Sequence, residues 1–158
     1  MPASILIVDA NAGNRILTRA ALEDGHYRLT AVASADDARD VVARHPPDLM
    51  LVDLGEAALS VLGLIAEMRD IPVIATGRFP GAALRLRALE AGAADLCDRP
   101  IPATLLQARI RRLLRRRSAL AEYALREETY RAFGLAETGE ALSGGSVRII
   151  GDMDEAAG

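Results

Sequence analysis

Four residues of this chain have side chains of the types that bind metal ions and phosphoryl groups. They are two carboxylates, a hydroxyl and a guanidinium, and each lies at the end of a short apolar stretch: Asp9, Asp53, Thr76 and Arg99. Oxygen ligands suit hard divalent cations, and arginine pairs readily with phosphate. If the fold brings these residues together, the sequence predicts a crevice that holds a divalent metal ion and a phosphoryl group.

The apolar stretches that precede these residues are predicted to be buried β-strands. Unbroken apolar runs of this length are typical of strands that are covered on both faces of a parallel sheet. The runs occupy residues 4–8, 49–52, 71–75 and, more weakly, 94–97. We expect the four residues to end the first, third, fourth and fifth strands in turn, with Pro100 directly after Arg99.

Apolar residues with helical spacing fill the segments between these strands, at residues 12–24, 35–44, 60–69 and 81–91. Ser34, with Asp37 three residues later, is typical of a helix start, whereas Gly25 and Gly92 follow predicted helix ends. The alternation predicts an α/β fold, a five-stranded parallel, doubly wound sheet with helices on both faces. Ligands of such sheets bind outside the carboxyl ends of the strands. The two aspartates therefore share a crevice if the first and third strands are neighbours.

Composition narrows the class of protein. With 158 residues, 51% of them apolar and 26% charged, the chain suits one globular domain with an appendage. The single Cys97 excludes an internal disulfide or a cysteine metal cluster, and all 19 basic residues are arginine, so no lysine amine is available. No apolar run is long enough to cross a bilayer and no signal peptide is recognisable, so we expect a cytoplasmic protein without a membrane partner.

Four sequence landmarks, in this order, resemble the receiver domain of two-component response regulators over residues 3–117. They are ILIVDAN at 5–11, PDLMLVDL at 47–54, IPVIATG at 71–77 and ALEAGAADLCDRP at 88–100. The resemblance implies a flavodoxin-like receiver fold in which Asp53 is the phosphoacceptor of a phosphorelay. It also implies that the phosphoryl donor is a sensor histidine kinase or a phosphotransfer protein.

The same resemblance assigns roles to the other residues of the crevice. Asp9, Asp53 and the carbonyl of Gly55 hold Mg²⁺, Thr76 supplies the switch hydroxyl, and Arg99 stands where the family has lysine. These assignments remain expectations at this stage, because they come from the family pattern.

This sequence departs from the family pattern at three places. The family has two adjacent acids after the first strand, whereas here the second position is Ala10, so we expect a degraded Mg²⁺ pocket that binds the ion weakly. Arg99 keeps the positive charge of the family's lysine but differs from it in geometry. The fourth strand is one residue short, which leaves either Thr76 or Gly77 at the hydroxyl position.

The segment after the predicted domain is read as a long helix over 103–132, so that residues 118–133 form a helical extension. Residues 134–146 have the Gly-rich composition of a linker, and residues 147–158 resemble the start of a second, truncated receiver. This arrangement resembles the junction between the first and second receivers of PleD-type diguanylate cyclases. It implies that the domain regulates a diguanylate cyclase output downstream.

The same features also allow a second interpretation of the function of this domain. The chain can be a pseudo-receiver, a phosphorylation-independent module for dimerisation or protein interaction that keeps the fold.

The six arginines between residues 109 and 117 can face nucleic acid, but the nearby apolar stripe, the acidic flanks and the 3% aromatic content favour a solvated or dimer-facing helix. We therefore expect no nucleic-acid partner, and we expect a homodimer or a second receiver to contact the long helix.

Overall fold

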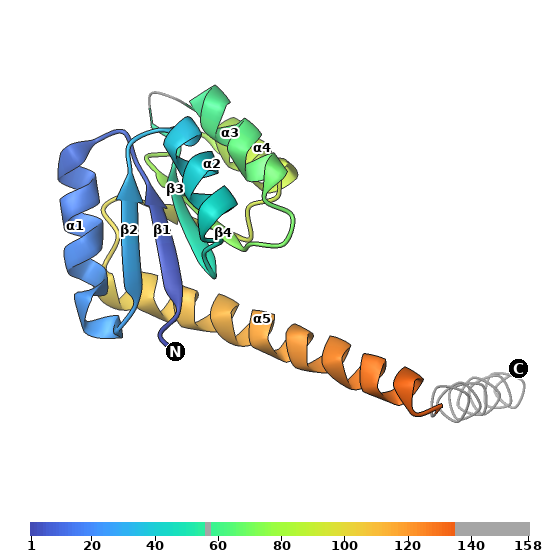
Figure 1. Cartoon of the computed structure of the whole chain (residues 1–158). Coiled ribbons are helices and arrows are strands. Elements are labelled where there is room, and N and C mark those ends of the chain that lie inside the picture. Colours follow the sequence, from blue (N-terminus) through green and yellow to red (C-terminus); the bar gives the residue numbers. More distant parts are fainter. Residues whose placement is uncertain (56–57, 135–158) are drawn as a thin grey trace, which may run out of the picture. The chain divides into compact units, whose positions relative to one another are not determined.

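The computed structural model describes residues 1–55 and 58–134, and its core is a five-stranded parallel sheet (Figure 1). The strands are β1 (Ser4–Val8), β2 (Arg28–Val32), β3 (Leu49–Asp53), β4 (Val73–Gly77) and β5 (Asp95–Asp98). They lie in the order β2-β1-β3-β4-β5, so β1 and β3 are neighbours as the shared-crevice prediction required. The predicted fold class is therefore confirmed.

Strand β2 is the one strand without a continuous apolar run in the sequence. Its residues alternate between exposed and half-buried positions because β2 lies at an edge of the sheet and pairs only with β1. A strand at an edge needs fewer apolar residues than a central strand such as β3, in which the first four residues are buried. Strand β4 runs to Gly77, two residues further than the apolar run indicated, and it includes Thr76.

Helices cover both faces of this sheet (Figure 1). They are α1 (Ala12–Leu22), α2 (Ala35–Arg44), α3 (Ala58–Glu67), α4 (Ala82–Ala91) and α5 (Ala103–Ala132), with a short 3₁₀ turn at Glu23–Gly25. One core joins alternate strand residues, including Ile7 and Leu51, to α1 and to Leu106 and Ile110 of α5. The other core joins the remaining strand residues to α2, α3 and α4. The period-two alternation of side chains along each strand supplies both cores.

Local capping chemistry sets several helix ends. Ser34 Oγ accepts a hydrogen bond from the backbone N–H of Asp37 at 3.1 Å, as predicted for the start of α2. Gly92 ends α4 in the left-handed region at φ 116°, a conformation that glycine adopts at low cost. After the first helix, His26 rather than Gly25 takes the left-handed conformation, at φ 56°.

Helix α1 presents a different face to the sheet than its apolar spacing indicates. Ile16 and Leu17 are 68% and 67% exposed, whereas Thr18 and Leu22 are the buried residues of this helix. The apolar stripe is short, and the helix start is fixed by Asn11, whose side chain accepts a hydrogen bond from the N–H of Asn14 at 2.9 Å. The cap and the sheet together set the rotation of the helix, so two large apolar residues face solvent.

Helix α5 runs through both compact units of the chain, which are Met1–Arg116 and Arg117–Gly158. In the first unit, Leu106, Ile110 and Leu113 are buried against the sheet, as the predicted stripe required. In the second unit, residues 118–134 are exposed. The predicted linker and second-receiver start, residues 135–158, lie outside the described residues. In the part of the chain that the structure describes, no helix has both the length and the apolar character needed to cross a membrane.

Candidate functional site

The polar residues singled out in the sequence meet at the carboxyl edge of the sheet. Asp53 and Thr76 are register partners in β3 and β4, and Asp9 directly follows β1, which pairs with β3. Alternation along the strands places all three on the same side of the sheet as Ile7, Leu51 and Ile74, the side that α1 and α5 cover. This shared parity is the reason why three distant strand ends converge.

Arg99 bridges the two carboxylates. Its Nε donates a hydrogen bond to Asp53 Oδ1 at 2.9 Å, and its Nη2 donates to Asp9 Oδ2 at 2.9 Å. The side chain of Arg99 is 16% exposed, that of Asp53 is 10% exposed and that of Asp9 is 2% exposed. The guanidinium therefore forms two largely desolvated ion pairs through two different nitrogens, and both pairs are charge-assisted hydrogen bonds.

The hydroxyl of Thr76 also acts on Asp53. Thr76 Oγ1 donates to Asp53 Oδ1 at 3.0 Å, and Arg99 Nη2 lies 3.4 Å from the same hydroxyl. The sequence left either Thr76 or Gly77 at the hydroxyl position. In the structure the hydroxyl of Thr76 contacts Asp53, the phosphoacceptor candidate. Gly77 follows it with φ 153° and has no side chain to offer.

Asp9 is held by groups that the sequence patterns did not single out. Its Oδ1 accepts a hydrogen bond from the backbone N–H of Asn11 at 2.9 Å, and its backbone carbonyl accepts one from Arg15 Nη1 at 2.7 Å. Burial is the main cause that raises the pKa of the Asp9 carboxyl above its ordinary value. The charge of Asp53 raises this pKa further, while the Asn11 N–H and Arg99 lower it. Arg15 is the fourth residue of α1, and its side chain reaches back to Asp9, which lies three residues before the helix starts.

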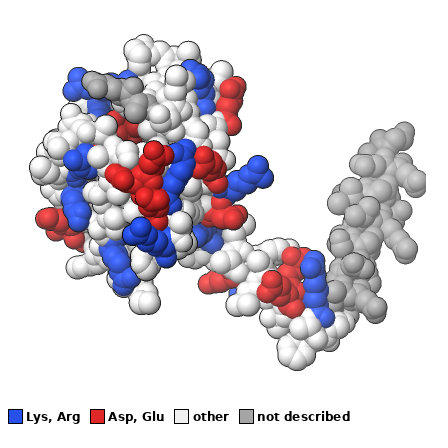
Figure 2. Space-filling model, turned by 45° about the horizontal axis from the view of Figure 1, so that its top comes forward, with Lys and Arg blue, Asp and Glu red and all other residues white. Residues whose placement is uncertain are grey.

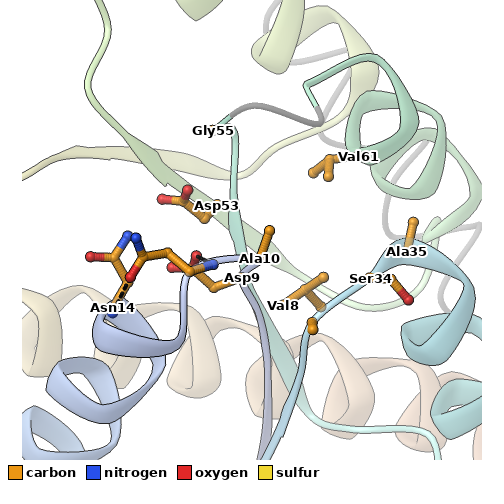
Figure 3. Close-up of a pocket in the computed structure, with 11 residues that line it drawn as sticks. Val8, Asp9, Ala10, Asn14, Ser34, Ala35, Asp53, Gly55 and Val61 are labelled. Carbon is orange, nitrogen blue, oxygen red and sulfur yellow. Dashed lines mark hydrogen bonds between the residues drawn. The ribbon is translucent and has the colours of Figure 1, made fainter.

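A cavity of about 260 Å³ opens beside these carboxylates (Figure 3). Its apolar wall includes Val8, Ala10 and Val61, and its polar wall includes Asp9 and Asp53. A β-carbon at residue 55 would lie only 3.0 Å from Asp53 Oδ2, so the glycine keeps this carboxylate oxygen approachable. Asp53 thus has one oxygen, Oδ1, held by Thr76 and Arg99, and the other beside Gly55 at the cavity.

A divalent metal ion at this edge would need several oxygen ligands. Within the described residues, every buried side-chain nitrogen or oxygen already has a hydrogen-bond partner, and no group of three His, Cys, Asp or Glu residues could hold a metal. Ala10 adds no oxygen, and Arg99 already bonds one oxygen of each carboxylate. Arranged in this way, the residues do not fit a tightly bound divalent ion.

Ion pairs outside the crevice involve several other arginines. On the face shown in Figure 2, acidic and basic side chains lie side by side. Arg39 bonds both Asp36 and Glu67, and Arg85 pairs with Asp98. Within the arginine run of α5, Arg109 and Arg112 both pair with Asp95 of β5. Two members of that run are therefore engaged within the protein itself.

The sequence also matches a known protein family. A sequence model of the response regulator receiver domain matches residues 5–111, more than half of the chain. The chain belongs to this family. Receiver domains act in two-component signalling, so this membership establishes the chain as a response regulator receiver domain.

Curated relatives show which longer proteins this receiver domain is similar to. The response regulator PleD of Caulobacter vibrioides is 30% identical over 99% of this chain, which spans 37% of PleD. The response regulator MprA of a Mycobacterium species is 30% identical over 75% of the chain and 53% of MprA. The chain thus covers about a third to a half of the length of these relatives, and their matched parts include the receiver region.

Solved structures agree with the fold. The receiver domain of a LuxO repressor protein from Vibrio parahaemolyticus has a TM-score of 0.71 at 21% identity, with 78% of this chain and 98% of that chain covered. NtrX from Brucella abortus, solved in complex with ADP, has a TM-score of 0.71 at 25% identity and covers 78% of this chain and 29% of its own. At these identities the likeness to the LuxO domain is a likeness of fold alone.

Proposed function

We propose that this receiver domain accepts a phosphoryl group on Asp53. The observation that supports this function most directly is the asymmetry of the Asp53 carboxylate. Oδ1 is fixed by Thr76 and Arg99, whereas Oδ2 lies beside Gly55 at the cavity of about 260 Å³. A nucleophile needs one oriented and accessible atom, and Oδ2 meets both conditions.

The proposed reaction is an in-line displacement on a phosphohistidine. Asp53 Oδ2 attacks phosphorus, the P–N bond breaks, and its electron pair returns to the imidazole nitrogen of the donor. The product is an acyl phosphate on Asp53. Arg99 and Thr76 bond Oδ1 of the same carboxylate at 2.9 Å and 3.0 Å, and from there they would stabilise the phosphorylated aspartate by charge and hydrogen bonding.

Mass spectrometry after incubation with acetyl phosphate, or with a phosphorylated histidine kinase, tests this reaction. We expect one phosphoryl adduct on the wild type and none on Asp53→Asn. Asp98→Asn is the matched control, because Asp98 ends β5, the strand beyond β4 at the same edge of the sheet, but pairs with Arg85 outside the crevice. A folded wild-type sample that gains no adduct from either donor, or an adduct that survives in Asp53→Asn, contradicts the proposal.

A second candidate function is favoured by Ala10 and by the bridge that Arg99 forms. In this alternative the chain is a pseudo-receiver, which keeps the crevice closed and signals by binding a partner independently of phosphorylation. Arg99 bonds both carboxylates, an arrangement that suits a permanently closed site. Beryllofluoride distinguishes the two: we expect it to shift the NMR signals of Asp53 and Thr76 in a phosphoacceptor and to leave them unchanged in a pseudo-receiver.

The output of this domain is proposed to be a diguanylate cyclase. Similarity to PleD extends over 99% of the chain, beyond the receiver itself, and residues 147–158 resemble the start of a second receiver. On this basis residues 134–146 are a linker between two receivers, and Asp53 regulates cyclic-di-GMP synthesis downstream. Sequencing of the reading frame past residue 158 tests this, and a frame without a cyclase domain would contradict it.

The partner of the long helix is proposed to be a second copy of the chain or a second receiver. Leu120, Tyr123, Leu125 and Tyr130 lie on α5 and are between 53% and 66% exposed. Large exposed apolar side chains are typical of interaction surfaces.

A further inference from the structure

We propose that Arg99 is a tethered counter-cation that takes the place of a divalent metal between Asp9 and Asp53, so that Mg²⁺ and Arg99 compete for the same two carboxylates. The inference concerns the resting protein. It holds whether or not Asp53 accepts a phosphoryl group, and it therefore stands apart from the proposed function.

The geometry of the bridge carries the first step. A cation shared by two carboxylates must contact an oxygen of each, and Arg99 does so through Nε to Asp53 Oδ1 and Nη2 to Asp9 Oδ2, both at 2.9 Å. A planar guanidinium can reach both at once because its donors point in different directions. A lysine ammonium at this position would be one point charge and could not reproduce the forked contact.

Burial carries the second step. The Asp9 side chain is 2% exposed and the Asp53 side chain is 10% exposed, so solvent screens their mutual repulsion poorly. In a pocket with a third acid, a divalent ion offsets this repulsion. Here Ala10 reduces the negative charge, and one guanidinium, itself only 16% exposed, offsets much of what remains.

Competition follows from charge and from the shared oxygens. A divalent ion that binds Asp9 and Asp53 would lie close to a guanidinium that already bonds one oxygen of each carboxylate. Two cations that lie close together repel each other, and breaking a buried ion pair costs free energy. Mg²⁺ can therefore bind well only after Arg99 leaves the carboxylates, and removal of Arg99 should create a metal site from residues that are already in place.

Thermal unfolding with and without Mg²⁺ tests this competition. Wild type, Arg99→Gln, Arg99→Lys and the control Arg85→Gln are compared in EDTA and in millimolar MgCl₂, with ionic strength matched by NaCl. We expect the Tm of the wild type and of Arg85→Gln to change by less than about 1 °C on adding Mg²⁺, whereas Arg99→Gln loses on the order of 10 °C in EDTA and regains about 5 °C with Mg²⁺. Arg85 is a suitable control because its ion pair with Asp98 lies on the same edge, outside the crevice.

Two results would overturn the proposal. One is a wild type that Mg²⁺ stabilises as strongly as Arg99→Gln, and the other is an Arg99→Gln protein that folds but gains nothing from Mg²⁺. If Arg99→Gln does not fold, Arg99→Lys decides the question, because it keeps the charge but offers one donor nitrogen in place of two, which loosens the hold on the two carboxylates. We expect the rise in Tm that Mg²⁺ causes in Arg99→Lys to be larger than in wild type and smaller than in a variant whose two carboxylates are fully released. An Arg99→Lys protein whose Tm responds to Mg²⁺ as little as that of wild type contradicts the competition.

Discussion

Thr76 and Asp53 are register partners in neighbouring strands, and the Thr76 hydroxyl donates a hydrogen bond to Asp53 Oδ1 at 3.0 Å. Because Thr76 is only 3% exposed, water cannot replace this donor. We expect Thr76→Val, which keeps the shape but loses the hydroxyl, to lower the free energy of unfolding by about 1–2 kcal/mol in urea denaturation. Thr76→Ser is the control that retains the donor, and equal losses in both variants would show that packing rather than the hydrogen bond is responsible.

Substitution of Ala10 tests whether the lack of a carboxylate at this position weakens Mg²⁺ binding. The Ala10→Asp variant adds a third carboxylate beside Asp9 and Asp53. Arg99 already bonds those two carboxylates, so the added carboxylate lacks a cationic partner in this bridge. In EDTA we expect a lower Tm than wild type because like charges repel, and in millimolar Mg²⁺ we expect the Tm to recover and the affinity for the ion to rise. Isothermal titration calorimetry measures the affinity, and identical Mg²⁺ titrations of the variant and wild type would refute the assigned geometry.

Two leucine-sized residues on α5 provide a matched pair for core packing. Ile110 is fully buried against the sheet, whereas Leu120 is 65% exposed on the same helix. For the monomer, at protein concentrations below the micromolar range, we expect Ile110→Ala to lower the free energy of unfolding by about 2–5 kcal/mol, since it leaves a cavity, and Leu120→Ala to change it by less than about 0.5 kcal/mol. Chemical denaturation measures both, and a similar loss in the two variants would mean that residue 120 is buried in solution.

Self-association through α5 should depend on its exposed apolar residues and on salt. We expect a homodimer at micromolar concentration in light scattering, and Tyr123→Glu should shift it toward monomer because a charge would be buried in the interface. The arginines of the run, such as Arg115 and Arg116, are expected to meet acids of the partner, so added salt should weaken association. A wild type that is monomeric under these conditions would rule out this interface.

Cys97 should be chemically inert in the folded protein. It is 3% exposed, and burial is the main cause that raises the pKa of its thiol above the ordinary value, with Asp95 and Asp98 adding to the rise and Arg109 opposing it. A raised pKa keeps the thiol protonated at neutral pH, and the thiolate is the reactive form. We expect negligible reaction with a disulfide reagent at neutral pH and one equivalent in denaturant. Rapid labelling of the native protein would contradict the burial of β5.

The sequence by itself determined the elements whose causes are local. Unbroken apolar runs predicted β1 and β3, because a strand buried on both faces has no polar position to interrupt it. The Ser34 cap and Gly92 predicted ends of α2 and α4, since each acts within its own turn. The sequence patterns did not predict the edge strand β2 or the exposed face of α1. The position of a strand at a sheet edge and the rotation of a helix depend on neighbours that lie far away in the sequence.

The chemical character of the crevice was decided only by the tertiary structure. The residue types at positions 9, 53, 76 and 99 predicted a shared site, but Arg99 contacts Asp53 across 46 residues and Asp9 across 90 residues of sequence. No local pattern specifies whether a guanidinium at that distance points to solvent, to one carboxylate or to both. That outcome depends on the strand order β1-β3-β4-β5 and on the side-chain parity that places all these residues on the α1 and α5 side of the sheet. Because these side chains are largely buried, solvent screens their charges poorly, and removing one partner of the bridge would leave an uncompensated buried charge.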